Sequence, residues 1–267
     1  MKIVALNLDS AAVIDLARAA GAAIMRVYAE DFEVEHKKDC SPLTAADLAA
    51  HRLIVDGLTA LTPGVPVLSE ESASVPWAER RRWTRYWLVD PLDGTREFVK
   101  KNGEFTVNIA LIEEGATTFG VVFAPALDEL HYGIRGVGAF VRDGANDVPI
   151  MSRRPAAPPL RVAASRSHMD PRTAAALAHM GEAQTQGLGS SLKFCRIAEG
   201  RIDVYPRFGP TSEWDTAAAQ CVLEAAGGAV LTLDGQPLRY NTKDSLLNPD
   251  FIALGDADLP WRDWLDG

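Results

Sequence analysis

A short hydrophobic strand that runs directly into a turn with two carboxylates is the most constraining feature of this sequence. Residues 86–89 (Tyr-Trp-Leu-Val) are aromatic or aliphatic, which is typical of a buried strand. Asp90 precedes Pro91, which has no backbone donor and favours an extended residue before it, so strand pairing is expected to end there. Gly94 permits a sharp reversal. We therefore expect Asp90 and Asp93 to leave one rigid turn with their carboxylates close together.

Two like charges held this closely raise each other's pKa unless a cation neutralises them, and Mg²⁺ prefers such oxygen ligands. A second acidic pair, Glu70-Glu71, follows an expected short strand at residues 65–69. Taken alone, that pair fits a solvated strand end as well as a metal ligand. Asp90 and Asp93 alone could equally form an Asx-type turn. The combination of the two clusters favours a magnesium site.

The composition is that of an ordinary globular protein, with 267 residues, 47% hydrophobic and 24% charged. The net charge of −9 argues against general binding to nucleic acid or acidic membranes, but a local basic pocket still permits a small anionic substrate. Cys40, Cys195 and Cys221 show neither zinc nor disulfide spacing. No signal peptide or membrane span is expected. The sequence thus indicates a cytoplasmic protein, with peripheral attachment to the inner membrane left open.

Hydrophobic periodicity divides the chain into an α+β half and an α/β half, which meet at a Pro-rich linker at residues 152–159. An Arg-rich stretch at residues 78–85 is expected at the surface. The expected halves are residues 1–152, which carry the metal site, and residues 153–267, which complete it. Expected helices are residues 10–30, 44–61, 171–180, 191–199 and 215–226; expected strands are residues 105–112, 118–123, 130–134 and 139–141, which form an antiparallel meander with a hairpin at Glu114-Gly115, and residues 160–164, 202–205 and 229–233.

Three further residues could contribute to chemistry, but two of them have ordinary structural explanations. Asp215 lies at the start of an expected helix, where an N-cap is its more common role, although a cap can also present its carboxylate to a metal. Asp47 lies three residues after Thr44, as in a capping box. Thr95 lies one turn from the carboxylates of Asp90 and Asp93, where its hydroxyl could hold a metal-bound water.

Two segments resemble the signatures of the inositol monophosphatase family. Residues 87–108, which include Asp-Pro-Leu-Asp-Gly-Thr, resemble the first signature, and Trp-Asp-Thr-Ala-Ala at residues 214–218 resembles the second. Within the family, the chain is most similar to the CysQ-type 3′(2′),5′-bisphosphate nucleotidases, through residues 41–47, 94–98, 102–108, 165–168 and 189–195. Arg96 departs mildly from the pattern, since Lys is frequent there, and Glu213 occupies a variable position.

The resemblance implies a layered αβαβα sandwich with a metal site between its two halves. It implies about two or three Mg²⁺ ions per site. One ion would be held by Glu70, Asp90 and the backbone carbonyl of Leu92, and a second by Asp90, Asp93 and Asp215. Asp47 and Thr95 would orient the attacking water, so that here the resemblance outweighs the capping explanation, and Glu71 would restrain Glu70 or a bound water.

The resemblance also implies the substrate contacts. The residues near the scissile phosphate would be Glu70, Leu92, Asp93, Gly94, Thr95 and Asp215. Ser190, Lys193 and Arg207 resemble contacts to a 5′-phosphate, with His168 as a weaker candidate, although Lys193 alone could be an ordinary solvated lysine. Arg207 suits phosphate geometry and lies in a rigid Pro-containing loop.

The expected reaction is Mg²⁺-dependent, lithium-sensitive hydrolysis of adenosine 3′,5′-bisphosphate to AMP and phosphate by a metal-activated water. Phosphoadenylyl sulfate is a further candidate substrate. The alternatives are an inositol monophosphatase, a fructose-1,6-bisphosphatase, or a non-catalytic metal- or nucleotide-binding protein. The last is disfavoured because pure binding needs no residues that orient water. A monomer is expected in preference to a dimer, with no nucleic-acid partner.

Overall fold

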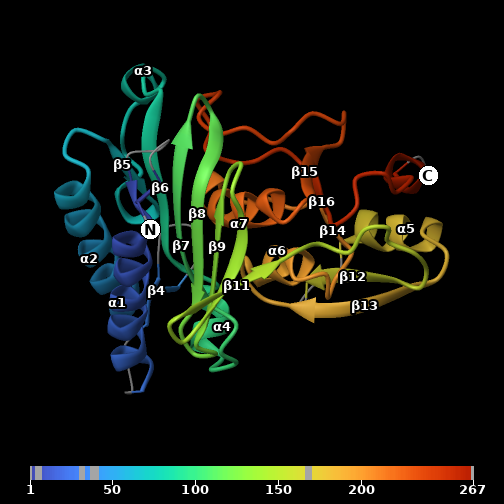
Figure 1. Ribbon diagram of the computed structural model, residues 1–267, viewed down its shortest axis with the longest axis horizontal. Coiled ribbons are helices and arrows are strands. Elements are labelled where there is room, and N and C mark those ends of the chain that lie inside the picture. Colours follow the sequence, from blue (N-terminus) through green and yellow to red (C-terminus); the bar gives the residue numbers. More distant parts are fainter. Residues whose placement is uncertain (1, 4–7, 30–33, 37–41, 166–169, 266–267) are drawn as a thin grey trace.

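The computed structural model describes residues 2–3, 8–29, 34–36, 42–165 and 170–265. These residues form successive layers of helix, sheet, helix, sheet and helix (Figure 1). The αβαβα sandwich expected from the sequence is confirmed. Within the described residues, no helix is both long and apolar enough to cross a lipid bilayer.

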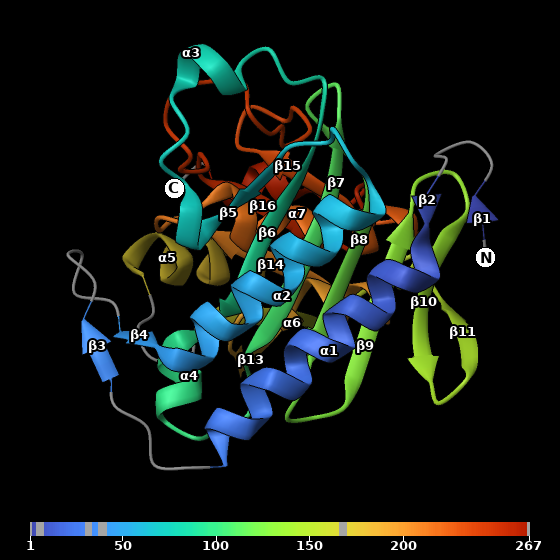
Figure 2. The same ribbon diagram turned by 90° about the vertical axis from the view of Figure 1, so that its left-hand side faces the viewer.

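Helices α1 (Ser10–Tyr28) and α2 (Ala45–Leu61) form the outer layer on the N-terminal side. They lie side by side across one face of a sheet (Figure 2). The side chain of Asp9 caps α1 by accepting a hydrogen bond from the backbone N–H of Ala12 at 3.3 Å. The apolar face of each helix recurs at helical spacing, as the sequence predicts, because only this face is buried against the sheet.

The first sheet has seven strands in the order β11-β10-β9-β8-β7-β6-β5. All neighbours are antiparallel except β5 and β6, which confirms the predicted meander and its hairpin. Glu114 and Gly115 both have positive φ at that hairpin, as a type I′ turn requires. The strands are β5 (Val67–Ser69), β6 (Arg85–Asp93), β7 (Thr106–Glu113), β8 (Ala116–Ala124), β9 (Glu129–Ile134), β10 (Gly138–Asp143) and β11 (Asn146–Ile150).

The second sheet has five strands in the order β13-β12-β14-β16-β15. Helices α6 (Leu192–Ala198) and α7 (Glu213–Ala225) lie between the two sheets, and α5 (Pro171–His179) covers the far face beside a C-terminal 3₁₀ helix, η2 (Trp261–Trp264) (Figure 1). The strands are β12 (Leu160–Ser165), β13 (Ala183–Leu188), β14 (Val204–Arg207), β15 (Ala229–Thr232) and β16 (Phe251–Leu254). The shorter elements are η1 (Glu70–Ser72), α3 (Trp77–Arg80), α4 (Thr95–Val99) and two small antiparallel pairs, β1 (Lys2–Ile3) with β2 (Leu8–Asp9) and β3 (Val34–His36) with β4 (Pro42–Thr44).

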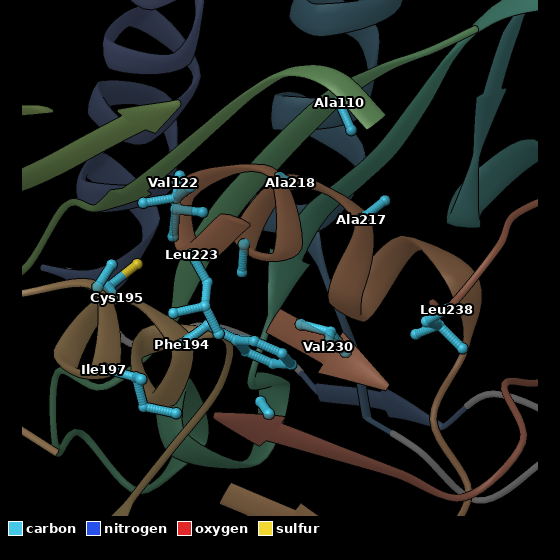
Figure 3. Close-up of a cluster of buried hydrophobic side chains, with 14 of the residues drawn as sticks. Ala110, Val122, Phe194, Cys195, Ile197, Ala217, Ala218, Leu223, Val230 and Leu238 are labelled. Atoms are coloured by element: carbon cyan, nitrogen blue, oxygen red, sulfur yellow. The ribbon is translucent and has the colours of Figure 1, made fainter. Parts of the chain in front are cut away.

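A hydrophobic core between the two sheets joins residues from both sides of the Pro-rich segment. Figure 3 shows Ala110 and Val122 of the first sheet beside Ala218 of α7. Glycine allows this close approach, because a Cβ added to Gly120 would lie 2.3 Å from the carbonyl oxygen of Ala218. Ser152 is also tied into the core, since its hydroxyl donates a hydrogen bond to the carbonyl of Gly255 at 2.7 Å.

The structure corrects three local expectations. Strand β6 does not end at Asp90 but continues to Asp93 through a β-bulge, where Pro91 needs no ladder donor. Helix α7 begins at Glu213 with Ser212 as its N-cap, so Asp215 is not the cap. Arg80 lies in the stretch expected at the surface but is only 2% exposed, because its guanidinium binds loop residues that follow β15, including Asn241 at 2.8 Å.

Candidate active site

The β-bulge in β6 places both carboxylates of the first signature. Residues three apart in a regular strand point to opposite faces. Here Asp90 pairs with Asn108 and Asp93 with Thr106, so β6 spans three residue steps where β7 spans two. The extra residue turns Asp93 back toward the side of Asp90, and the charge of Asp93 accordingly acts on the buried carboxyl of Asp90.

The bulge and the turn that follows it are held by their own side chains. The backbone N–H of Leu92 donates a hydrogen bond to Oδ1 of Asp90 at 3.0 Å, so an Asx turn is present. Gly94 has φ +86° and provides the reversal into α4. The Thr95 hydroxyl donates to the carbonyl oxygen of Leu92 at 3.4 Å, which keeps hydroxyl and carbonyl together beside the carboxylates.

Carboxylates from three other segments surround Asp90. Glu70 leaves β5 beside it, because β5 and β6 are parallel and Ser69 pairs with Val89. Asp47 comes from α2 and Asp215 from α7. Burial raises the pKa of Asp90 well above its usual value, and the nearby charges of Glu70, Asp93, Asp215 and Asp47 raise it further. Acidic side chains that are distant in sequence therefore lie close enough to the buried carboxyl of Asp90 for their charges to act on it.

Asp215 is fixed at the first turn of α7. Its Oδ2 accepts a hydrogen bond from the backbone N–H of Ser212 at 2.8 Å in a capping box. Shielding from water raises the pKa of Asp215 to about 8, with further contributions from the charges of Asp93 and Glu70. A cation at this position would favour the ionised form.

The donor chemistry of this cluster fits Mg²⁺. Its members are carboxylates and one backbone carbonyl, which are hard oxygen ligands, and their mutual repulsion favours a divalent cation. Among the described residues, no three His, Cys, Asp or Glu side chains are already arranged around one point as a ligand set.

A cavity of about 600 Å³ opens between this turn and the C-terminal half. It is lined by Asp93, Gly94 and Asp215 together with Ser190, Lys193 and Arg207. The structure therefore brings part of each candidate set of phosphate contacts to one cavity, whereas Glu70, Leu92 and Thr95 are not among its lining residues. In Figure 1, α6 lies between the two sheets, β14 belongs to the second sheet, and α4 lies at the lower end of the first sheet.

Lys193 supplies a buried positive charge to this cavity. Its ammonium donates hydrogen bonds to the carbonyl oxygens of Ser190 at 2.7 Å and Leu188 at 3.3 Å. Burial lowers the pKa of Lys193 to about 8, although the carboxylate of Asp93 opposes the change. The charge of Arg207 lowers it as well, which places the guanidinium nearby. Lys193 is buried, unlike the solvated lysine that was the sequence-based alternative.

The sequence did not predict the hydrogen bonds that hold the loop at residues 189–191 against the segment around Asp93 and Glu104. Oδ2 of Asp93 accepts hydrogen bonds from the backbone N–H of Ser191 at 2.7 Å and from its hydroxyl at 2.8 Å. Oε2 of Glu104 accepts a hydrogen bond from the backbone N–H of Gly189 at 2.7 Å. Both segments belong to stretches that carried the family resemblance, but their pairing is visible only in three dimensions.

The remaining predicted residues are placed as follows. Glu71 is half-buried in η1, and its charge acts on His51 of α2. Asp47 is fully buried on the same helix. His168 lies outside the described residues.

Comparison with known proteins identifies the class to which this fold and site belong. The chain belongs to the inositol monophosphatase family, which it matches over residues 7–257. It is 52% identical to the 3′(2′),5′-bisphosphate nucleotidase CysQ of Salmonella typhimurium, over 90% of this chain and 96% of that protein, and equally similar to CysQ of Escherichia coli K12.

Solved structures show the same fold. The crystal structure of CysQ from Bacteroides thetaiotaomicron superposes with a TM-score of 0.81 at 43% identity, covering 91% of this chain and 96% of that one. The extragenic suppressor protein suhB from Bartonella henselae superposes with a TM-score of 0.78 at 25% identity, over 96% and 97% of the two chains.

Proposed function

We propose that this chain is a Mg²⁺-dependent 3′(2′),5′-bisphosphate nucleotidase that converts adenosine 3′,5′-bisphosphate to AMP and phosphate. The observation that carries the proposal is the single cavity that joins the acidic cluster at Asp93 and Asp215 to the cationic wall at Lys193 and Arg207. A substrate with two phosphates needs both. The 52% identity to proteins named 3′(2′),5′-bisphosphate nucleotidase supports this choice of substrate. Phosphoadenylyl sulfate is a second candidate substrate.

The acidic cluster has the role of metal ligand in this proposal. Glu70, Asp90, Asp93, Asp215 and the carbonyl of Leu92 would hold about two or three Mg²⁺ ions. Bound Mg²⁺ supplies Lewis acidity that activates water and stabilises the leaving oxygen.

Side chains next to the ligands would act on the attacking water. The Asp47 carboxylate and the Thr95 hydroxyl oxygen, whose hydrogen is donated to the Leu92 carbonyl, would accept hydrogen bonds from that water and so orient it in line with the scissile bond. Glu71 restrains Glu70 from the same short helix. Gly94 lets the substrate approach the turn closely, because it carries no side chain.

The cationic wall would bind the 5′-phosphate. Ser190 offers a hydroxyl, Lys193 a charge fixed by two carbonyls, and Arg207 a planar donor that matches phosphate oxygens. Because Lys193 has a pKa of about 8, it is mainly protonated at pH 7. We also propose that the protein acts as a monomer in the cytoplasm, which light scattering of the purified chain would check for the oligomeric state.

Phosphate release from a substrate panel, measured with and without Mg²⁺, tests the function. Adenosine 3′,5′-bisphosphate should be hydrolysed fastest, and Li⁺ should inhibit. Asp90→Asn should abolish turnover in a folded protein, whereas Asp128→Asn, which removes the charge of an exposed residue paired with Arg18, should not change it. Faster release from inositol 1-phosphate or fructose 1,6-bisphosphate would assign one of those activities instead. Nucleotide binding without phosphate release would indicate a non-catalytic protein.

A further inference from the structure

His51 of α2 links two parts of the chain that carry candidate site carboxylates. These are the helix of Asp47 and the segment of Glu70 and Glu71. His51 follows Asp47 by one helical turn, so both side chains lie on the same face of α2. Its Nδ1 lies 2.8 Å from the hydroxyl oxygen of Ser69, within hydrogen-bond distance. Ser69 is fully buried and is the last residue before Glu70. This one hydrogen bond therefore connects the helix of Asp47 to the segment of Glu70 and Glu71.

The segment that carries Glu70 and Glu71 follows a short strand at the edge of the sheet. Strand β5 has only three residues and lies at the edge of the seven-stranded sheet, paired on one side to β6. The chain then turns into the 3₁₀ helix η1, whose N-cap Ser69 makes no capping hydrogen bond with its side chain. The hydroxyl of Ser69 is thus directed to His51 rather than to the backbone of η1.

The surroundings of His51 suit a neutral imidazole. Burial lowers its pKa below the usual value, and this effect exceeds the raising effect of the Glu71 carboxylate. A neutral ring has one nitrogen that donates and one that accepts, so it can form a defined hydrogen bond with a hydroxyl without adding a charge to an acidic site.

We propose that His51 is a positioning residue of the metal site, which sets the distance between Asp47 and the Glu70–Glu71 pair through its hydrogen bond to Ser69. This inference rests on the proposed function, because the carboxylates matter as ligands and water-orienting groups only if the site binds metal. His51 is not among the residues that line the cavity, so we assign it no direct contact with the substrate. Its loss should alter how well the carboxylates converge on an ion, while the cationic wall at Lys193 stays intact.

Four single variants of the full chain and one double variant, His51→Ala/Ser69→Ala, test the proposal. His51→Ala removes the hydrogen bond, and Ser69→Ala removes it from the other side. In His51→Asn the amide group reaches the position of Nδ1, so the hydrogen bond can be kept. Thr59→Ala is the matched control, since it removes an exposed hydroxyl whose hydrogen bond stays within α2.

Two independent measurements are made on each variant. The first is the Mg²⁺ dependence of phosphate release, with kcat and KM for adenosine 3′,5′-bisphosphate. The second is the rise in melting temperature caused by Mg²⁺ alone, which requires no turnover. For His51→Ala and Ser69→Ala we expect the half-saturating Mg²⁺ concentration to rise about tenfold, as for other residues that orient metal ligands, with KM for the nucleotide changed by less than about twofold.

His51→Asn should recover most of the Mg²⁺ affinity, and Thr59→Ala should resemble the wild type. The double variant His51→Ala/Ser69→Ala should bind Mg²⁺ no more weakly than either single variant, because both substitutions remove the same hydrogen bond. The inference fails if His51→Ala and Ser69→Ala lower the melting temperature but leave Mg²⁺ affinity unchanged, or if only KM rises. If His51→Ala does not fold, Ser69→Ala and His51→Asn decide the matter. If the wild type does not hydrolyse the bisphosphate, the proposed function fails separately, and the Mg²⁺-induced melting shift still tests His51.

Discussion

A buried ion pair between β9 and α6 gives a prediction about stability that can be worked out in detail. Nε2 of His131 lies 2.6 Å from Oε1 of Glu199, and His131 is fully buried. Burial alone lowers the pKa of His131, but the sulfur of Cys195 and the carboxylate of Glu199 together raise it to about 10. Burial likewise raises the pKa of Glu199, but His131 and Arg196 lower it to about 2. The pair is therefore ionised across the neutral range.

The pKa changes fix the pH range in which the pair stabilises the fold. The pKa of His131 is higher in the folded state than its usual 6.5. The contribution of His131 to the free energy of unfolding is therefore complete below pH 6.5 and is lost as the pH rises through about 10. The pKa of Glu199 falls from 4.5 to about 2, so the contribution of Glu199 to the free energy of unfolding is complete above pH 4.5. It is lost on acidification toward pH 2. The stabilisation by the pair is thus greatest between pH 4.5 and 6.5.

His131→Gln should lower the free energy of unfolding by about 3–5 kcal/mol at pH 6, because it removes the charged imidazole that the pKa change from 6.5 to about 10 shows to be stabilised, while Glu199 keeps its hydrogen bonds to Arg196. The difference from the wild type should then shrink by roughly 1.4 kcal/mol per pH unit above pH 6.5, or roughly 3 kcal/mol by pH 8.5. Urea unfolding followed by tryptophan fluorescence at pH 6, 7.5 and 8.5 measures both quantities.

Arg201→Ala is the matched control, since Arg201 is 63% exposed and contacts the same Glu199 at 3.3 Å. It should change the free energy of unfolding by less than about 1 kcal/mol, with little dependence on pH above 6. A difference between His131→Gln and the wild type that stays constant from pH 6 to 8.5 would refute the assignment of a charged, buried His131.

Three further predictions concern the site and the core. Lys193→Met should raise KM for adenosine 3′,5′-bisphosphate at least about tenfold, because a charged hydrogen-bond partner is lost. It should change KM for a nucleoside 3′-monophosphate much less, and equal changes in the two KM values would contradict a 5′-phosphate pocket. Ser191→Ala removes a hydrogen bond to the Asp93 carboxylate, so kcat/KM should fall about tenfold in steady-state assays, and an unchanged value would show that this contact does not position the loop. Gly120→Ala should lower the free energy of unfolding by about 1–3 kcal/mol or more in urea titrations, since its Cβ would lie 2.3 Å from the carbonyl oxygen of Ala218.

The parts of the fold that could be predicted from the sequence are those encoded locally. Residues 86–89 form a strand and Gly94 a reversal because apolar side chains and backbone freedom act over a few residues. The hairpin at Glu114-Gly115 has the same local origin. Strands β11 and β13 were missed, because both are exposed, polar edge strands that lack apolar alternation and are stabilised by one neighbour.

The candidate ligands were identified as residue types, but their partners depend on long-range packing. Arg80 looks like a surface arginine in sequence, and its amide partner Asn241 lies 161 residues away. Ser191 lies 98 residues from Asp93, so no local pattern marks their hydrogen bond. His51 was missed for the same reason, since Ser69 reaches it only once β5 packs against α2.

The bulge in β6 explains how one short segment can serve both the proposed metal site and the loop that carries Lys193. In a regular strand, Asp90 and Asp93 would face opposite sides of the sheet, and only one of them could reach the space in front of α7. The extra residue brings Asp93 to the side of Asp90, where its Oδ2 also accepts the hydrogen bonds of Ser191. Asp93 therefore belongs both to the acidic cluster and to the support of the loop that presents Lys193. On the proposed function, any change that moves this carboxylate should affect metal binding and recognition of the second phosphate together.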